Sequence, residues 1–388
     1  MVTKRGRKFL NTPGPTHVPD RVMNAMHQPT LDLSDPDFLD VSMSCFLDMR
    51  KVFNTEGEIF LYSSNGHGAW EASLVNVFSP GDKILVPETG NFSNAWASMA
   101  KALKLEVETL PGNWRRAIDI EALEEHLKKD TKKEIKGVLI IHTETATGIT
   151  NDLSAIRSAI DSANHPGLLI VDTVAAAGTV DYRMDEWGID VIASGSQKGY
   201  MIPPGLSFVA MSKRAWEANK RSDLPKFYLD LKQYLKTVNQ NSNPFTPAIN
   251  LYFALEASLT MMQKEGLNNI FSRHSRHQKA TQEGIKAMGL NLFTKEHYGS
   301  PAITAVKPEN IDAESIRKAI KNDFDILLAG GQDHLKGKIF RIGHLGFVNN
   351  RDIISVISAL ESTLDKMGKL KAPIGQGIAK TISVLNNE

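Results

Sequence analysis

A lysine stands in a turn of small residues directly after a short apolar run, in the segment Val191-Ile192-Ala193-Ser194-Gly195-Ser196-Gln197-Lys198-Gly199. Upstream, the apolar run Leu168–Val171 ends in Asp172. Both runs are too short for buried helices, so they favour strands. Asp172 and Lys198 are 26 residues apart, which suffices for one crossover that returns to the same sheet edge. We therefore expect the acid and the amine to lie at one edge of a sheet.

The same pattern extends over residues 58–212, where short apolar runs alternate with amphipathic stretches. The predicted strands are Glu58–Tyr62, Lys83–Pro87, Glu106–Leu110, Gly137–His142, Leu168–Asp172, Val191–Ala193 and Leu206–Ala210. The predicted helices between them are His67–Phe78, Asn94–Leu103, Ile120–Lys129 and Leu153–Ala163. Such alternation predicts an α/β fold, with a mostly parallel seven-stranded sheet covered by helices on both faces.

The chain has 388 residues, whereas single hydrophobic cores stop growing at roughly 250–300 residues. We predict an N-terminal loop or arm over residues 1–20, a large domain over residues 21–255 and a smaller α+β domain over residues 256–388. The small domain is expected to open with a long helical region that ends near Met288. Its further predicted elements are strand Ala302–Val306, helix Ala313–Lys321 with Asp312 as its cap, and strand Lys338–Gly343.

Composition excludes several classes of function. A net charge of +1 and 23% charged residues give no field suited to nucleic acid or to a membrane surface. No apolar run approaches the roughly 18–20 residues of a membrane span, and the start lacks the apolar stretch of a secretory signal. The single cysteine, Cys45, excludes an internal disulfide and argues against a thiolate metal site. We expect a cytoplasmic protein, with Cys45 buried as a packing residue.

Two other groups of charged residues are expected to be structural. His274 and His277 have helical spacing, but with no nearby carboxylate a solvated helix face is the favoured interpretation and no metal site is predicted. A basic start is interpreted as a solvated, partly disordered terminus rather than an arm that grips an anion: Lys4, Arg5, Arg7 and Lys8.

Ligands of open α/β sheets bind beyond the carboxyl ends of the strands, so the polar residues at those ends are informative. The first predicted strand is followed by Ser63–Gly68, a glycine-containing turn that opens a helix. Free backbone N–H groups and the helix dipole suit a phosphate there, although a tight turn capped by Ser64 or Asn65 explains the same residues. The segment Thr143–Gly148 either contacts a ligand or caps a helix.

Asp172 and Lys198 point to a specific chemistry when they are taken together. A carboxylate after a buried strand is costly to desolvate unless it meets a cation or strong donors. A caged lysine loses its proton readily, and a neutral amine attacks carbonyl groups, whereas a lone lysine is most often a solvated loop residue. An acid, an amine and a phosphate-type helix start are the parts that a pyridoxal cofactor requires.

The chain resembles the class V (fold-type I) aminotransferases over nearly its whole length, and within them the glyoxylate aminotransferases. The residues that carry the resemblance are Pro13-Gly14-Pro15-Thr16, Asn65-Gly66-His67, Val171-Asp172-Thr173, Gly195-Ser196-Gln197-Lys198-Gly199, Pro203-Pro204-Gly205-Leu206 and Phe340-Arg341-Ile342-Gly343-His344-Leu345-Gly346. Bacterial serine–glyoxylate aminotransferases are the most similar group, on the segments Glu88–Phe92, Pro111–Arg116, His142–Thr145, Asp185–Trp187 and Phe245–Ala248.

The resemblance implies pyridoxal 5'-phosphate as the cofactor and a role for each matching residue. Lys198 forms the Schiff base and moves the proton, Asp172 bonds the pyridine nitrogen and Phe92 stacks on the ring. Thr145 is implied at the ring hydroxyl. The residues implied at the phosphate are Asn65, Gly66, His67 and Gln197, with Thr246 acting on the neighbouring subunit. Arg341 binds the substrate carboxylate, Gly14 approaches the substrate, and the shared Thr246 implies a homodimer or higher oligomer.

The resemblance also implies the reaction, a transamination from an amino acid, L-serine by preference, to glyoxylate, which gives hydroxypyruvate and glycine. Aspartate–glyoxylate, alanine–glyoxylate or pyridoxamine–pyruvate transfer remain open, as does a lyase on the same scaffold, while a catalytically silent scaffold is disfavoured. Two positions depart from the family pattern. Many relatives carry a tyrosine where this chain has Ser242 or Asn243, and His67 replaces a small residue, so its backbone alone is expected to meet the phosphate.

Overall fold

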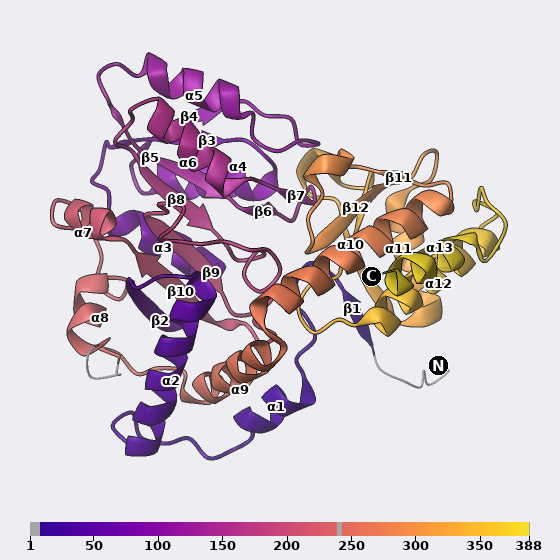
Figure 1. The fold of residues 1–388 in the computed structure, drawn as a ribbon, viewed down its shortest axis with the longest axis horizontal. Coiled ribbons are helices and arrows are strands. Elements are labelled where there is room, and N and C mark those ends of the chain that lie inside the picture. Colours follow the sequence, from indigo (N-terminus) through magenta and orange to yellow (C-terminus); the bar gives the residue numbers. More distant parts are fainter. Residues whose placement is uncertain (1–7, 239–242, 388) are drawn as a thin grey trace.

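The large part of the molecule is built on one seven-stranded sheet. Figure 1 shows its place in this computed structural model. Residues 8–238 and 243–387 are described. The strands lie in the order β2-β10-β9-β8-β5-β3-β4. Their bounds are β2 Glu58–Ser64, β3 Lys83–Pro87, β4 Glu106–Leu110, β5 Ile135–Ile141, β8 Leu168–Asp172, β9 Val191–Gly195 and β10 Gly205–Met211. All pairings are parallel except those of β10, which runs antiparallel to β2 and β9.

Helices cover both faces of this sheet. Successive side chains of a strand point to opposite faces, and apolar side chains project from both, so both faces are buried under helices. In β5, Val138 and Ile140 join one apolar core, and Leu139 and Ile141 join the other. The first core includes residues of α2 Pro36–Phe53, α5 Ile120–Lys129, α6 Leu153–Ser162 and α9 Ile249–Glu265. The second includes residues of α3 Gly66–Val75, α4 Asn91–Ala102, α7 Lys213–Asn219 and α8 Leu231–Val238.

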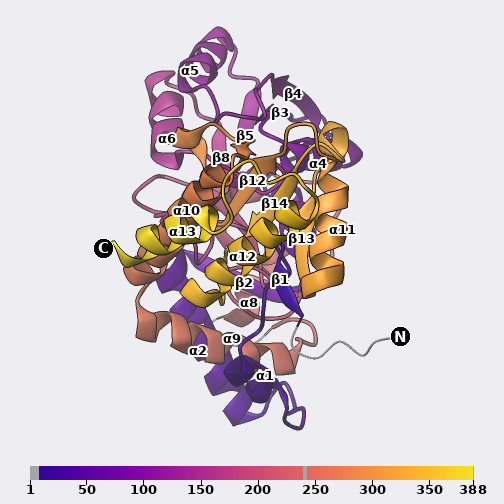
Figure 2. The same ribbon diagram turned by 90° about the vertical axis from the view of Figure 1, so that its right-hand side faces the viewer.

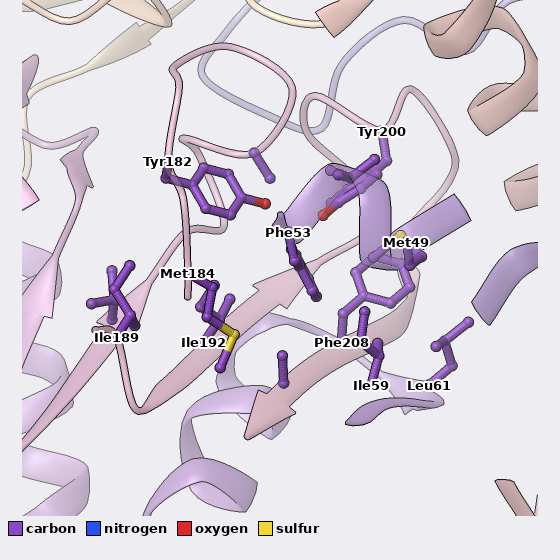
Figure 3. Close-up of a cluster of buried hydrophobic side chains, with 14 of the residues drawn as sticks. Met49, Phe53, Ile59, Leu61, Tyr182, Met184, Ile189, Ile192, Tyr200 and Phe208 are labelled. Atoms are coloured by element: carbon purple, nitrogen blue, oxygen red, sulfur yellow. The ribbon is translucent and has the colours of Figure 1, made fainter. Parts of the chain in front are cut away.

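Figure 3 shows part of the first core, where Met49 and Phe53 of α2 lie over Ile59, Ile192 and Phe208 of the sheet. All five side chains are buried. Cys45, also from α2, is buried in the same core and has a raised thiol pKa because of that burial.

The small domain lies at one end of the molecule, on the right in Figure 1, and faces the viewer in Figure 2. Its sheet has the order β1-β13-β14-β12-β11. The strands are β1 Phe9–Asn11, β11 Asn291–Leu292, β12 Ile303–Lys307, β13 Ile326–Gly330 and β14 Phe340–Gly343. The helices are α10 Leu267–Ala287, α11 Ala313–Phe324, α12 Asn350–Lys366 and α13 Gln376–Asn386, with 3-10 turns Glu296–Tyr298 and Asp333–Leu335.

The predicted fold class is confirmed, and the predicted elements match the observed ones to within a few residues. Asp312 caps α11 by accepting a hydrogen bond from Ser315 N. The segment predicted as an N-terminal loop or arm also holds a strand, since β1 pairs in parallel with β13, more than 300 residues later. Helix α1 Asp20–Met26 then packs against α9. The proposed domain limits at residues 20 and 255 remain a prediction.

Candidate active site

A cavity of about 350 Å³ lies at the carboxyl ends of the central strands. Nine of the residues singled out in the sequence line it: Gly14, Asn65, Gly66, His67, Phe92, Thr145, Asp172, Gln197 and Lys198. A larger groove of about 560 Å³ lies at the opposite edge of the sheet, beside Ile135 and Leu168, and holds none of them. The smaller cavity is therefore the candidate site, where strands β5 and β8 end at Ile141 and Asp172.

Lys198 stands in the turn between β9 and β10, enclosed by the N-terminal segment. Its Nζ donates a hydrogen bond to the carbonyl of Pro13. A Cβ on Gly14 would lie within 2.6 Å of the lysine's Cδ, Cε and Nζ. The φ of Gly14 is +122°, which residues other than glycine rarely adopt, so both the space and the backbone conformation favour glycine at this position. Burial lowers the pKa of Lys198 to about 8, while Asp172 opposes that change and Arg341 reinforces it. A larger fraction of this amine is thus neutral near physiological pH than of an exposed lysine.

Asp172 ends β8 on the floor of the same cavity, and its side chain is buried. Its Oδ1 accepts a hydrogen bond of 2.7 Å from Val174 N, and its Oδ2 accepts one from the indole of Trp70. Burial raises the pKa of Asp172 to about 6, although both donors and the charge of Lys198 lower it. A cationic N–H group in the cavity would stabilise the charged carboxylate further.

The third feature of the cavity is the N-terminus of α3. Asn65 is its N-cap, and the side-chain Oδ1 accepts hydrogen bonds from His67 N (3.0 Å) and Gly68 N (3.4 Å). The helix dipole makes such a terminus favourable for an anion. Gln197 borders the same place, and its Oε1 is buried with no partner among the described residues. A bound group that meets this amide would complete its hydrogen bonding.

Trp70 is a site residue that the sequence analysis missed. It lines the cavity, donates to Asp172, stacks on Trp96 (5.3 Å between ring centroids, 17° between planes) and meets Phe92 edge to face at 6.3 Å. A signal was available, since Trp70 lies four residues after Gly66 and therefore on the same face of α3, one turn later.

Phe92 and Thr145 both line the cavity. Phe92 is in the first turn of α4 and partly buried. Thr145 lies between the short strands β6 Thr143–Glu144 and β7 Ile149–Thr150, and its carbonyl accepts a 2.7 Å hydrogen bond from Nη1 of Arg341. Thr294 Oγ1 donates to the carbonyl of Thr147 in the same turn. This turn therefore joins the large sheet to the small domain.

Arg341 and Thr246 do not line the cavity of the single chain. Arg341, in β14, is buried and also donates from Nε to Gly330 O (2.8 Å) and from Nη1 to Gln332 Oε1 (3.2 Å). Burial lowers its pKa to about 10, and Glu144 opposes that change. Thr246 is exposed just before α9. Asn243 donates to the hydroxyl of Tyr252 (2.7 Å), and Ser242 lies outside the described residues.

The prediction that His274 and His277 form a solvated face is wrong. Both are fully buried, because α10 packs against α12 and α13. The His274 ring contacts Ile270 O at 2.8 Å through Nδ1 and accepts a hydrogen bond from Gly346 N at Nε2 (3.1 Å). Among the described residues, no group of three or more His, Cys, Asp or Glu could hold a metal ion. In the same part of the chain, no helix combines the length and apolarity that crossing a bilayer needs.

Comparisons with known proteins place this site in a family. Residues 44–344 match the family described as aminotransferase class-V. The chain is 44% identical over 379 residues to the soluble hydrogenase 42 kDa subunit of Anabaena cylindrica, covering 98% of this chain and 99% of that one. It is 38% identical over 376 residues to the serine–glyoxylate aminotransferase of Hyphomicrobium methylovorum, covering 95% and 93%.

A solved structure shows the same architecture. The ureidoglycine–glyoxylate aminotransferase of Bacillus subtilis superposes with a TM-score of 0.92 at 30% identity and covers 100% of both chains. A family match over residues 44–344 agrees with relatives that align along nearly the full length. The chain therefore belongs to the class-V aminotransferase family.

Proposed function

We propose that this enzyme transfers the amino group of L-serine to glyoxylate, with pyridoxal 5'-phosphate held through Lys198. The coarser statement, an aminotransferase acting on an amino acid and a 2-oxo acid, follows from family membership. Glyoxylate is the acceptor named for two of the relatives, whose donors differ. The observation that carries the proposal is the meeting of Lys198, Asp172 and the N-terminus of α3 around one cavity.

Membership in the class-V family implies pyridoxal phosphate, and the residues present fit it. The N-terminus of α3 suits a phosphate group, and the side-chain amide of Gln197, which lines the cavity, can donate an N–H to it, together with Asn65, Gly66 and His67. Asp172 would face the ring nitrogen. The cofactor, when bound, supplies an electron-withdrawing ring that stabilises negative charge on the carbon next to the transferred nitrogen.

The side chains of this protein then have distinct tasks. Asp172, with its pKa raised to about 6, is charged at neutral pH and holds a proton on the ring nitrogen facing it. Lys198 would hold the cofactor covalently through Nζ. Once an incoming amino acid had displaced it, Nζ would take the proton from the substrate's α-carbon and deliver it to the carbon on the far side of the transferred nitrogen. Its pKa of about 8 suits both directions of proton transfer. Phe92 would stack on the ring, and Thr145 would contact its hydroxyl.

Substrate binding is assigned to Arg341, because a planar guanidinium binds a carboxylate through two parallel hydrogen bonds. The donor and the acceptor share only that carboxylate, so one arginine serves both half-reactions. Gly14 lets the N-terminal segment approach the substrate beside Lys198. The exposed Thr246 would bind the phosphate of a second subunit, which makes a homodimer part of the proposal. The cytoplasmic location expected from the single cysteine stays a prediction.

The visible spectrum of the purified protein with pyridoxal phosphate tests the proposal. We expect an absorption band that bleaches on addition of L-serine and returns with glyoxylate. Borohydride reduction followed by peptide mapping should place the label on Lys198, and Lys198→Ala should remove it. An unlabelled Lys198 would refute the covalent assignment.

Substrate preference needs a separate comparison of half-reactions. Aspartate, alanine and pyridoxamine should bleach the band more slowly than serine, with pyruvate a poorer acceptor than glyoxylate. A faster reaction with one of these would reassign the substrate within the family. Steady consumption of one amino acid with no 2-oxo acid added as acceptor would indicate a lyase. A protein that binds no cofactor would indicate a catalytically silent scaffold.

A further inference from the structure

Glu144 is a fully buried carboxylate beside the cavity that has no part in the roles described so far. Its Oε2 accepts hydrogen bonds from Phe92 N (3.0 Å) and Ser93 N (3.1 Å), and its Oε1 accepts one from Ala146 N (3.0 Å). The side chain is completely inaccessible. It does not line the cavity, so it would not touch a ligand there.

These contacts make Glu144 the hydrogen-bond acceptor at the start of α4. The N-cap of that helix is Gly90, which has no side chain of its own, and a Cβ there would lie 2.5 Å from Cγ of Glu144. A glutamate 52 residues after Phe92 thus occupies the place that a local capping side chain usually takes. An acceptor of this kind is stabilised by the unsatisfied N–H groups and by the helix dipole.

The capped turn is the one that carries Phe92. Because Glu144 holds Phe92 N directly, the carboxylate fixes the backbone from which the aromatic ring enters the cavity. On the other side, the next residue, Thr145, accepts a hydrogen bond from Arg341. Burial raises the pKa of Glu144 to about 7, and the three N–H donors lower it. Losing this acceptor would therefore leave buried donors unsatisfied next to the proposed ring site.

We propose that Glu144 is a positioning residue, which sets the height and tilt of the Phe92 ring over the cofactor by anchoring the first turn of α4. The inference rests on the proposed function for the identity of the group against which Phe92 stacks. It assigns no proton transfer to Glu144. The effect is expected in the affinity and the asymmetric environment of the bound cofactor.

The experiment uses full-length protein and four variants: Glu144→Gln, Phe92→Ala, the double variant and Glu361→Gln. Glu361 is the matched control, since it is also buried and also accepts from the start of a helix, through Gly377 N (2.8 Å) and Ile378 N (3.4 Å) of α13, in the small domain. The readouts are the dissociation constant for pyridoxal phosphate, the circular dichroism of the bound cofactor and the thermal midpoint.

We expect Glu144→Gln to weaken cofactor binding about tenfold and to reduce the cofactor dichroism, because the amide replaces one carboxylate oxygen with a donor that faces at least one of the three backbone N–H groups. Glu361→Gln should lower the thermal midpoint without either effect. The double variant should bind no more weakly than Phe92→Ala, since Glu144 acts through that ring.

Other results would overturn the proposal. Additive losses in the double variant would show that Glu144 does not act through Phe92, and an unchanged cofactor affinity and dichroism in Glu144→Gln would show that it positions nothing. If Glu144→Gln does not fold, Glu144→Asp, which shortens the side chain but keeps the charge, takes its place under the same criteria. Failure of the wild type to bind pyridoxal phosphate would instead refute the proposed function itself.

Discussion

The hydrogen bond from Trp70 to Asp172 gives the sharpest prediction of this structure. Trp70→Phe removes the indole N–H and keeps an aromatic ring, so Asp172 retains only the backbone donor Val174. A hydrogen bond to a charged group contributes about 1.5–3 kcal/mol. One pKa unit corresponds to about 1.4 kcal/mol, so losing the hydrogen bond from Trp70 should raise the pKa of Asp172 by roughly 1–2 units from its value of about 6.

The sign of the pH dependence follows from the same shift. The folded pKa of Asp172 already lies above the ordinary value of 3.8, so folding favours the protonated acid. The free energy of unfolding therefore falls as the pH rises from about 4 through the folded pKa. In Trp70→Phe that fall continues to a higher pH. The variant should match the wild type at pH 5, apart from lost packing, and be less stable by about 1.5–3 kcal/mol above pH 8.

Urea unfolding of the cofactor-free protein at pH 5 and pH 8.5 measures this difference. Trp96→Phe is the matched control, because Trp96 is fully buried, stacks on Trp70 and has an indole nitrogen with no partner among the described residues. Trp96→Phe loses the same side-chain volume but no hydrogen bond to a charged group. Its loss in free energy of unfolding should therefore not depend on pH. The reasoning would be refuted if Trp70→Phe lowered the free energy of unfolding equally at both pH values. It would also be refuted if Trp96→Phe showed the same pH dependence as Trp70→Phe.

Three further perturbations test other parts of the structure. Asn65→Ala removes the N-cap of α3 and should cost about 1 kcal/mol in urea unfolding while weakening cofactor affinity; an unchanged affinity would argue against a phosphate at this helix. Burial lowers the pKa of His142, His277 and His344 to about 3, 4 and 3, so stability that is full above pH 6.5 should be lost as the pH falls toward 4. His142→Phe should reduce that loss between pH 6.5 and 5, and an identical slope would contradict the assignment. The buried Cys45, with its raised thiol pKa, should react with a thiol reagent only after unfolding, and rapid labelling of the native protein would contradict its burial.

Local patterns in the sequence were sufficient for the fold class and for the centre of the candidate site. Strand and helix periodicities report which faces are buried, and they located Lys83–Pro87, Glu106–Leu110 and Leu168–Asp172 with their observed bounds. Asp172 and Lys198 could be placed together because the ends of neighbouring strands meet at one edge of a sheet. Residue roles, by contrast, came from the family resemblance.

Long-range packing decided the rest, since no local pattern shows which surfaces meet. Strand β1 joins a sheet whose other strands lie near the opposite end of the chain, and His274 is buried only because α12 and α13 cover α10. Trp70 and Glu144 gain their partners across 102 and 52 residues respectively. The amino acids alone therefore specified the layers of the fold and the acid–amine pair, whereas the donors, acceptors and burial that tune this pair exist only once distant segments are packed together.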